Sequence, residues 1–236
     1  MGTSCARTIA SAHADWHLAL AGRHEPSAMQ TINRLKRETG NQRIEWIPLD
    51  LAFLESIRAF ASTFAARSLP PLHAINCNAG LQAVSGTRYT ADGFEMTFGV
   101  NCLGHFLLTN LLLRSLVTPA RIVFVSSTSH DPDRPKTLMT RLMGLIPPRY
   151  SDVSALAWPE RSSQGNGQNE SPRVVGMRRY ATSKLCVVLY AYEFARRLQA
   201  QGYSIPEHPI TVNVYNPGTT PDTGLARDAS IINFFS

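Results

Sequence analysis

The stretch LHAINCNAG, residues 72–80, decides the fold, because a strand-length apolar run ends there in a polar turn that contains glycine. Apolar runs of similar length recur along the chain, at residues 16–21, 44–48, 121–126 and 210–215. Helix-length stretches alternate with them, at residues 5–14, 27–39, 54–67, 92–116 and 180–199. This alternation predicts an α/β fold.

The apolar runs are continuous rather than alternating, which is typical of strands buried on both faces of a parallel sheet. We therefore expect a single domain, residues 1–236, built on a doubly wound parallel sheet. In such a sheet, ligands bind beyond the carboxyl ends of the strands. Polar or glycine residues follow four of the expected strands, and these are Asp50, Asn78-Ala79-Gly80, Ser126-Ser127 and Pro217-Gly218.

The segment YATSK, residues 180–184, pairs a tyrosine with a lysine near the start of an expected helix. Helical spacing puts Tyr180 and Lys184 on one face, one turn apart. An ammonium favours the phenolate, so we expect Lys184 to lower the pKa of Tyr180 toward neutral pH. Such a pair can exchange a proton with a carbonyl or an alcohol. Taken alone, the same spacing also occurs as solvated neighbours on many helices.

Five motifs stand along the chain in one order: Asn78-Ala79-Gly80, Asn101, Ser126-Ser127, Tyr180-x-x-x-Lys184 and Pro217-Gly218. In this order they resemble the short-chain dehydrogenase/reductase family, over nearly the whole chain. The segments DGFE at 92–95 and NCLGHF at 101–106 are most similar to its retinol dehydrogenase and protochlorophyllide reductase branch. The resemblance implies a Rossmann-type fold and an oxidoreductase that moves a hydride between a nicotinamide and a carbonyl or hydroxyl carbon.

The resemblance also implies four catalytic residues. Tyr180 would be the acid in reduction and the base in oxidation, while Lys184 would lower its pKa and hydrogen-bond the nicotinamide ribose. Ser127 would donate a hydrogen bond to the substrate oxygen. Asn101 would anchor a water molecule in a proton relay behind Lys184. Each has a plain structural alternative: Ser127 could end a strand, and Asn101 could cap or kink its helix.

A cofactor site is implied at the strand ends. Asp50 would meet the adenine ring, although it could also cap a helix N-terminus. The turn at Asn78, Ala79 and Gly80 would let the backbone pass close to the cofactor, which glycine permits. The residues expected along the nicotinamide are Tyr180, Lys184, Pro217, Gly218 and Thr219, with Thr223 as a further contact.

Arg23 decides between the two nicotinamide cofactors. The family places an acidic residue after the strand at 16–21 when the cofactor is NAD, because a carboxylate accepts the ribose hydroxyls and repels a phosphate. This chain has Gly22-Arg23, and an arginine can pair with a 2′-phosphate. We therefore expect NADP rather than NAD, and the alternative for Arg23 is a solvated loop position.

The chain departs from the family at both ends. The family begins with a strand and a Thr-Gly-x-x-x-Gly-x-Gly turn that carries the pyrophosphate. Counting back from Arg23 places Gly2 at the middle glycine and Ser4 at the last, so the first strand and a last strand are expected to be lacking. One reading is an incomplete version of a working reductase. The other is a degenerate, inactive homologue that acts, if at all, as a binding or scaffold protein.

The composition indicates an ordinary soluble enzyme, with 44% hydrophobic residues and a net charge of +6. The basic residues are scattered, so we expect no nucleic-acid partner. The four cysteines are far apart, which indicates a reducing compartment and no metal site. No signal peptide is evident, and the apolar helix at 103–116 is expected to be too short and polar to cross a membrane. We expect a cytoplasmic protein.

The long loop-rich insertion at residues 128–177 is expected to sit over the active site. Its apolar residues suggest a lining for a small lipophilic carbonyl or alcohol, or equally a surface helix packed on the core: Leu138, Met139, Leu142, Met143, Leu145, Ile146 and Tyr150. The family often dimerises through the helices that begin near Asp92 and Tyr180, so a homodimer is expected as one assembly.

Overall fold

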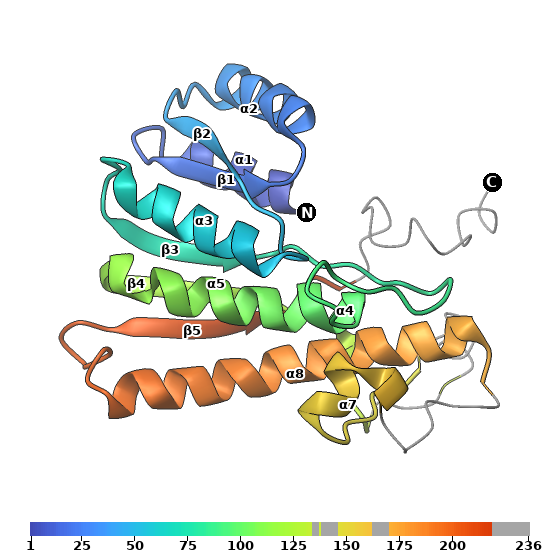
Figure 1. Cartoon of the computed structure of the whole chain (residues 1–236). Helices are drawn as coiled ribbons and strands as arrows, with labels where there is room; N and C mark the ends of the chain where they lie inside the picture. The colour runs from blue at the N-terminus through green and yellow to red at the C-terminus, as the bar shows by residue number, and fades with distance from the viewer. Residues whose placement is uncertain (134–136, 138–145, 162–169, 219–236) are drawn as a thin grey trace.

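The computed structural model describes residues 1–133, 137, 146–161 and 170–218 (Figure 1). Its strands are β1 (Leu18–Gly22), β2 (Ile44–Pro48), β3 (Leu72–Cys77), β4 (Leu116–Val125) and β5 (Ile210–Tyr215). All neighbouring strands pair in parallel, which confirms the expected α/β fold with a parallel sheet. The sheet comes in two parts, β1-β2 and β3-β4-β5, and no strand of the described chain joins them.

Helices connect the strands on the pattern expected from the sequence. The longer ones are α1 (Gly2–Ala12), α2 (Glu25–Thr39), α3 (Leu54–Ala66), α5 (His105–Leu112) and α8 (Pro172–Ala200). The shorter ones are α4 (Met96–Phe98), α7 (Val153–Ala157), the π-helical turn η1 (Gly99–Gly104) and the 3-10 turns η2 (Leu113–Ser115), η3 (Thr128–His130) and η4 (Pro159–Arg161).

The β1-β2 sheet is covered on both faces. Leu18, Leu20 and Ile44 point to one face, where they pack with Ile32 and Leu35 of α2 and with the alanines of α1. On the other face, Ala19 and Ile47 join the main core, which also contains α3. Alternation along each strand therefore divides its side chains between two clusters.

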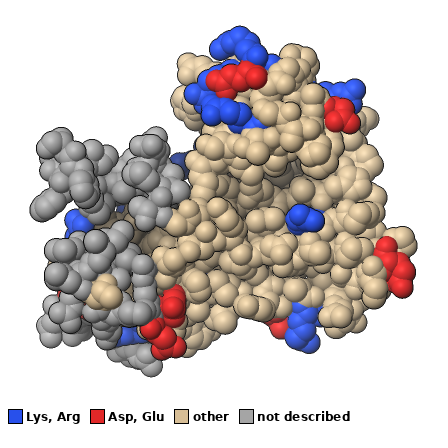
Figure 2. Space-filling model, turned by 180° about the vertical axis from the view of Figure 1, so that it is seen from behind, with Lys and Arg blue, Asp and Glu red and all other residues tan. Residues whose placement is uncertain are grey.

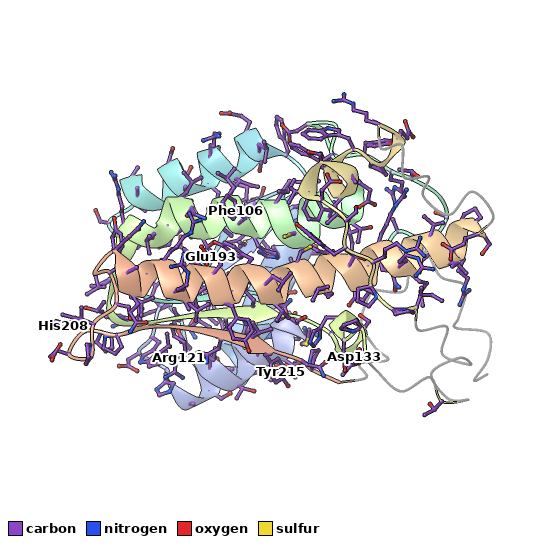
Figure 3. All side chains as sticks on the ribbon, turned by 90° about the horizontal axis from the view of Figure 1, so that it is seen from below. Phe106, Arg121, Asp133, Glu193, His208 and Tyr215 are labelled. Carbon is purple, nitrogen blue, oxygen red and sulfur yellow. The ribbon has the colours of Figure 1, made fainter. Side chains whose placement is uncertain are left out.

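Among the described residues, helices cover the β3-β4-β5 sheet on one face. Its core side chains, among them Ile75, Ile122 and Phe124, pack under α3, α5 and α8. The opposite face exposes polar residues, including Arg121 and Tyr215, which Figure 3 places on the side of the sheet away from Phe106 of α5. Seen from behind, Figure 2 shows this face with few charged side chains and a hollow between the two parts of the molecule.

Two expected helices differ from the structure. The single helix expected at 92–116 is instead a succession of α4, η1, α5 and η2, which starts at Met96. Asp92 lies outside the helix because its carboxylate accepts a hydrogen bond from Leu54 N at 2.8 Å. Helix α8 begins at Pro172, well before Tyr180, since Ser171 caps it by accepting a hydrogen bond from Val174 N at 3.4 Å.

The segment Met96–Ser115 has the length and composition of a membrane span, and 61% of its most apolar window is buried inside the protein. The helical segment is longer than the stretch considered in the sequence, because it extends back from residue 103 to Met96. Its burial is that of a core helix of the described fold.

Candidate active site

Helix α8 carries the Tyr180–Lys184 pair into the interior. Both side chains are buried, with 8% of Tyr180 and 3% of Lys184 exposed, so they are not the solvated neighbours of a surface helix. Glycine at Gly176 permits this approach, because a Cβ there would lie 2.2 Å from the backbone oxygen of Ala83. Helix α8 therefore places Tyr180 and Lys184 at the carboxyl end of β4.

Lys184 is held by the backbone of β4. Its Nζ donates to Val125 O at 2.8 Å and lies 5.8 Å from the centre of the Tyr180 ring. Ser126 Oγ in turn donates to Lys184 O at 3.0 Å. Burial lowers the pKa of Lys184 to about 8, so the ammonium loses its proton more readily than an exposed lysine.

Tyr180 differs from the expectation for its acidity. Burial raises the pKa of Tyr180, and a side-chain hydrogen bond with Ser127 acts in the opposite direction. The pKa of Tyr180 is therefore raised in this structure rather than lowered as expected, because burial is the largest influence and the Lys184 ammonium is directed at Val125 O.

Ser127 is the second residue after β4, so its hydroxyl lies at the edge of the sheet beside Tyr180. Ser127 is the N-cap residue of η3. Its Oγ accepts hydrogen bonds from Ser129 N at 3.3 Å and from Ser129 Oγ at 3.0 Å. Ser127 thus both ends a strand and faces the phenol of Tyr180.

Asn101 lies in the π-helical turn η1 and is fully buried. Its Oδ1 accepts from Leu81 N at 2.8 Å, while its Nδ2 donates to Leu81 O at 2.9 Å and to Ser183 Oγ at 3.0 Å. Asn101 therefore joins the turn after β3 to helix α8. Turns of this type interrupt α-helices most often at functional sites.

The turn Asn78-Ala79-Gly80 follows β3 and faces the same residues. A Cβ on Gly80 would lie 3.3 Å from both Asn101 Oδ1 and Lys184 Nζ, so glycine keeps this space free. Ala79 O is bound by Nε2 of the buried His105 at 2.8 Å. Burial lowers the pKa of His105 to about 4, so a neutral ring donates to this carbonyl.

Asp50 and Arg23 follow β2 and β1. Asp50 Oδ1 accepts from Ala52 N at 2.9 Å, which makes a local turn. Asp50 does not cap α3, because the cap residue is Phe53 and Asp92 takes the Leu54 amide. Arg23 is exposed, and within the described residues no carboxylate forms an ion pair with it.

At the N-terminus, Gly2 and Ser4 lie inside the first turn of α1 rather than in a loop before a helix at 5–14. The helix begins earlier because Cys5 N already bonds Met1 O at 3.0 Å. Gly2 lies against Asn78, with its ideal Cβ position 2.8 Å from Asn78 Nδ2, so the free amides of α1 point toward the turn after β3.

Pro217 and Gly218 follow β5, where Gly218 has a φ of 70° and its amide bonds Asn216 Oδ1 at 3.2 Å. Thr219 and Thr223 lie outside the described residues, as do Leu138, Met139, Leu142, Met143 and Leu145. Described parts of the insertion pack along α8, since Arg149 N donates to Thr182 Oγ1 at 3.0 Å and Ile146 contacts Met177.

Two residues with structural roles at the site, His105 and Ser183, were not singled out from the sequence. Both stand inside motifs that were quoted there, NCLGHF and YATSK. Their partners, Ala79 and Asn101, are distant in sequence, so only the fold reveals their roles. Among the described residues, no cluster of His, Cys, Asp and Glu could hold a metal ion.

Known proteins are similar to this chain in sequence. A family model described as short chain dehydrogenase matches residues 1–137. Human polyprenol dehydrogenase (Homo sapiens) is 36% identical over 208 residues, which cover 86% of this chain and 52% of that protein. Protochlorophyllide reductase A, chloroplastic, from Oryza sativa subsp. japonica is 31% identical over 237 residues, covering 97% of this chain and 57% of that protein.

A crystal structure of an uncharacterized protein from Mycobacterium paratuberculosis has the same fold, with a TM-score of 0.64 and 30% sequence identity. The match covers 96% of this chain and 67% of that one. The chain spans about half the length of the curated relatives it matches. With a family model that matches more than half of its residues, this chain belongs to the short-chain dehydrogenase family.

Proposed function

We propose that this chain is the core of an NADP-dependent oxidoreductase that interconverts a carbonyl and an alcohol, with Tyr180 as the acid or base. One observation carries the proposal: Asn101, Ser127, Tyr180 and Lys184 come from η1, the end of β4 and α8, and meet beside the turn after β3. Such convergence of buried polar groups at strand ends is typical of an active site in an α/β sheet.

Each side chain has a task that follows from its contacts. The Ser127 hydroxyl and the Tyr180 phenol interact, so both can bind one substrate oxygen and hold it in place. In reduction, Tyr180 gives its proton to that oxygen, and in oxidation it takes the proton back. Lys184 supplies positive charge behind the phenol, and Asn101 keeps α8 in register with the turn after β3.

The described residues fit a nicotinamide dinucleotide. Gly80 leaves room beside Lys184 Nζ where a side chain would stand, and the first turn of α1 presents backbone amides suited to a phosphate. When bound, the nicotinamide supplies or accepts the hydride. The protein contributes position, the proton and exclusion of water.

Arg23 supports NADP over NAD, because an exposed guanidinium at the end of β1 can pair with a 2′-phosphate. Replacing it tests this preference: Arg23→Glu is expected to weaken NADPH binding about tenfold while leaving NADH binding within about twofold. A matched change, Arg34→Glu on the exposed face of α2, should alter neither. Equal binding of NADPH by Arg23→Glu would contradict the assignment.

A lipophilic substrate is the first class to screen, and cellular reduction is the direction we propose. Val84, Ile146 and Met177 form an apolar cluster, and Met177 lies one turn before Tyr180 on the same face of α8. Two relatives are named for polyprenol and protochlorophyllide. The insertion at 128–177 would then provide part of the substrate lining.

A second candidate is nicotinamide binding without turnover, as in an inactive homologue with a binding or scaffold role. The observation that favours it is the divided sheet, since no strand of the described chain joins β1-β2, which precedes Arg23 and Asp50, to β3-β4-β5, which positions the catalytic set.

Binding and turnover separate the two candidates. We would titrate the chain with NADPH by fluorescence and then follow NADPH oxidation with a panel of lipophilic aldehydes and ketones. Binding with turnover that Tyr180→Phe abolishes supports the oxidoreductase. Binding without turnover for every substrate supports the second candidate, and failure to bind either nicotinamide cofactor contradicts both.

We also propose a cytoplasmic location and a homodimer. All four cysteines are free, in keeping with a reducing compartment. Phe106 of α5 and Leu189 and Tyr192 of α8 are exposed, with 75% of Tyr192 accessible, and could cover one another in a dimer. Tyr192→Glu should then convert a dimer to a monomer in sedimentation experiments.

A further inference from the structure

Glu95 is a buried carboxyl that the proposed reaction does not use. It precedes α4, and only 1% of its surface is exposed. Its Oε2 caps α4 by accepting a hydrogen bond from Phe98 N at 2.8 Å. Its Oε1 is buried and has no hydrogen-bond partner among the described residues. A carboxyl oxygen that is buried without a hydrogen bond has lost its hydration with nothing in return, so a partner is expected there.

A small cavity of about 30 Å³ lies beside this carboxyl. Its polar lining comes from Glu95, Arg179 and Ser183, and its apolar lining includes Phe98, Leu156 and Pro159. One water molecule needs roughly 10–15 Å³ and two to four polar partners, so the cavity has both the room and the partners for one.

The donors and acceptors around the cavity match a single water. Ser183 Oγ donates to Tyr180 O at 2.7 Å and accepts from Asn101 Nδ2 at 3.0 Å, which leaves one acceptor position on this hydroxyl. Arg179 Nη1 donates to Thr87 Oγ1 at 2.9 Å, and the guanidinium carries further N–H groups. A water can accept from Arg179 and donate to both Glu95 Oε1 and Ser183 Oγ.

We propose that this cavity holds a structural water that links Glu95 to Ser183, and that Glu95 thereby acts as a positioning residue for Asn101 and Tyr180. The link runs from α4 through the water to the Ser183 hydroxyl, which contacts both of those residues. Burial raises the pKa of Glu95. A neutral carboxyl also offers an oxygen to the water, so the link does not depend on the charge.

The first test does not require activity. A high-resolution crystal structure of the chain is expected to show a water within hydrogen-bond distance of Glu95 Oε1 and Ser183 Oγ. An empty cavity, with the Thr97 hydroxyl donating directly to Glu95, would overturn the proposal. This result would leave the proposed oxidoreductase function untouched.

The second test rests on the proposed function and uses steady-state kinetics. Glu95→Ala removes both the helix cap and the link, and is expected to lower kcat about fivefold with little change in KM for NADPH, about the effect of one lost water-mediated contact. Glu95→Gln keeps an oxygen for the helix cap and places an NH2 group at the cavity, where it can donate to the water, so it should restore kcat. His24→Ala is the matched control, because His24 caps α2 by accepting a hydrogen bond from Ser27 N at 3.3 Å, and no residue of α2 lines the cavity.

The double variant sharpens the second test. Ser183→Ala removes the other end of the link, so adding Glu95→Ala should reduce kcat no further. Additive losses, or an equal loss in His24→Ala, would show that Glu95 acts only through the stability of its helix. If the wild-type chain has no turnover, the proposed function fails, and the crystallographic result alone decides the role of the cavity.

Discussion

The β1-β2 sheet and the β3-β4-β5 sheet bury their apolar side chains in different ways. The first has helices or core on both faces but supplies only backbone turns and two polar side chains, Arg23 and Asp50, to the site. The second has one face exposed, yet its strand ends and its helices bring together every residue of the proposed catalytic set. Under the proposed function, the side chains expected at the 2′-phosphate and the adenine therefore belong to the first part, and the catalytic set belongs to the second.

The largest expected effect tests whether the β3-β4-β5 part alone supplies the group that transfers the proton. Tyr180→Phe removes only the phenolic oxygen, so it should lower kcat about a thousandfold, or about 4 kcal/mol in activation free energy, because no proton donor remains. NADPH affinity, measured by fluorescence titration, should stay within about twofold. A comparable loss of NADPH affinity would show that the Tyr180 phenol also holds the cofactor.

The next prediction compares the stability of the two parts. Leu35 of α2 and Ile122 of β4 are both fully buried, and truncating either to alanine should cost about 3 kcal/mol. Because the two sheets are not hydrogen-bonded to each other, Leu35→Ala should raise amide exchange mainly in β1 and β2, whereas Ile122→Ala should raise it across β3, β4 and β5. Hydrogen exchange followed by mass spectrometry would show this. Uniform exchange in both variants would mean that the two sheets unfold as one unit.

A pH prediction concerns His105, which lies where α5 meets the turn after β3. Burial lowers the pKa of His105 from 6.5 to about 4, so the unfolded chain takes up a proton in this window and the folded chain does not. Stability should fall as the pH drops from 6.5 to about 4, by roughly 3 kcal/mol from this residue, and this contribution is fully present above pH 6.5.

Urea unfolding at several pH values measures this effect. In His105→Gln the fall with pH should be shallower by that amount. His73→Gln is the control, since His73 is exposed on β3. An unchanged pH profile in His105→Gln would contradict the assignment.

The smallest expected effect compares one glycine from each part. Gly80→Ala places a methyl group 3.3 Å from Lys184 Nζ and Asn101 Oδ1, and should weaken NADPH binding about tenfold. Gly22→Ala at the end of β1 meets nothing within 4 Å and should change binding less than about twofold. Equal losses would show that the cofactor contacts both strand ends equally closely.

The strands were predictable because their signal is local. The runs at 44–48 and 210–215 match β2 and β5 residue for residue, and those at 16–21 and 72–76 are within two residues of β1 and β3 at each end. The motifs Asn78-Ala79-Gly80 and Tyr180-x-x-x-Lys184 were also visible, and their parallel strands bring them to one edge of the sheet.

What the sequence could not reveal depends on distant contacts. The π-helical turn η1 interrupts the helix expected at 92–116, and Asn101 within it bonds Leu81, twenty residues earlier in the chain. Gly176 lies inside α8 because a side chain there would meet the backbone oxygen of Ala83, a residue far away in the sequence. The acidity of Tyr180 was predicted in the wrong direction, since spacing reveals a neighbouring charge but not desolvation.

Two serine caps fix the chain on either side of residues 128–170. Ser127 precedes η3 and Ser171 precedes α8, and the side chain of each accepts a hydrogen bond from a backbone amide that follows it. The segment between them also contacts the helix that carries Tyr180 and Lys184, because Arg149 N donates to Thr182 Oγ1. If relatives exchange this segment in evolution, we expect the two caps to be kept and the contact with Thr182 to be replaced. Under the proposed function, chimeras joined at these two serines would test whether the segment sets the substrate range.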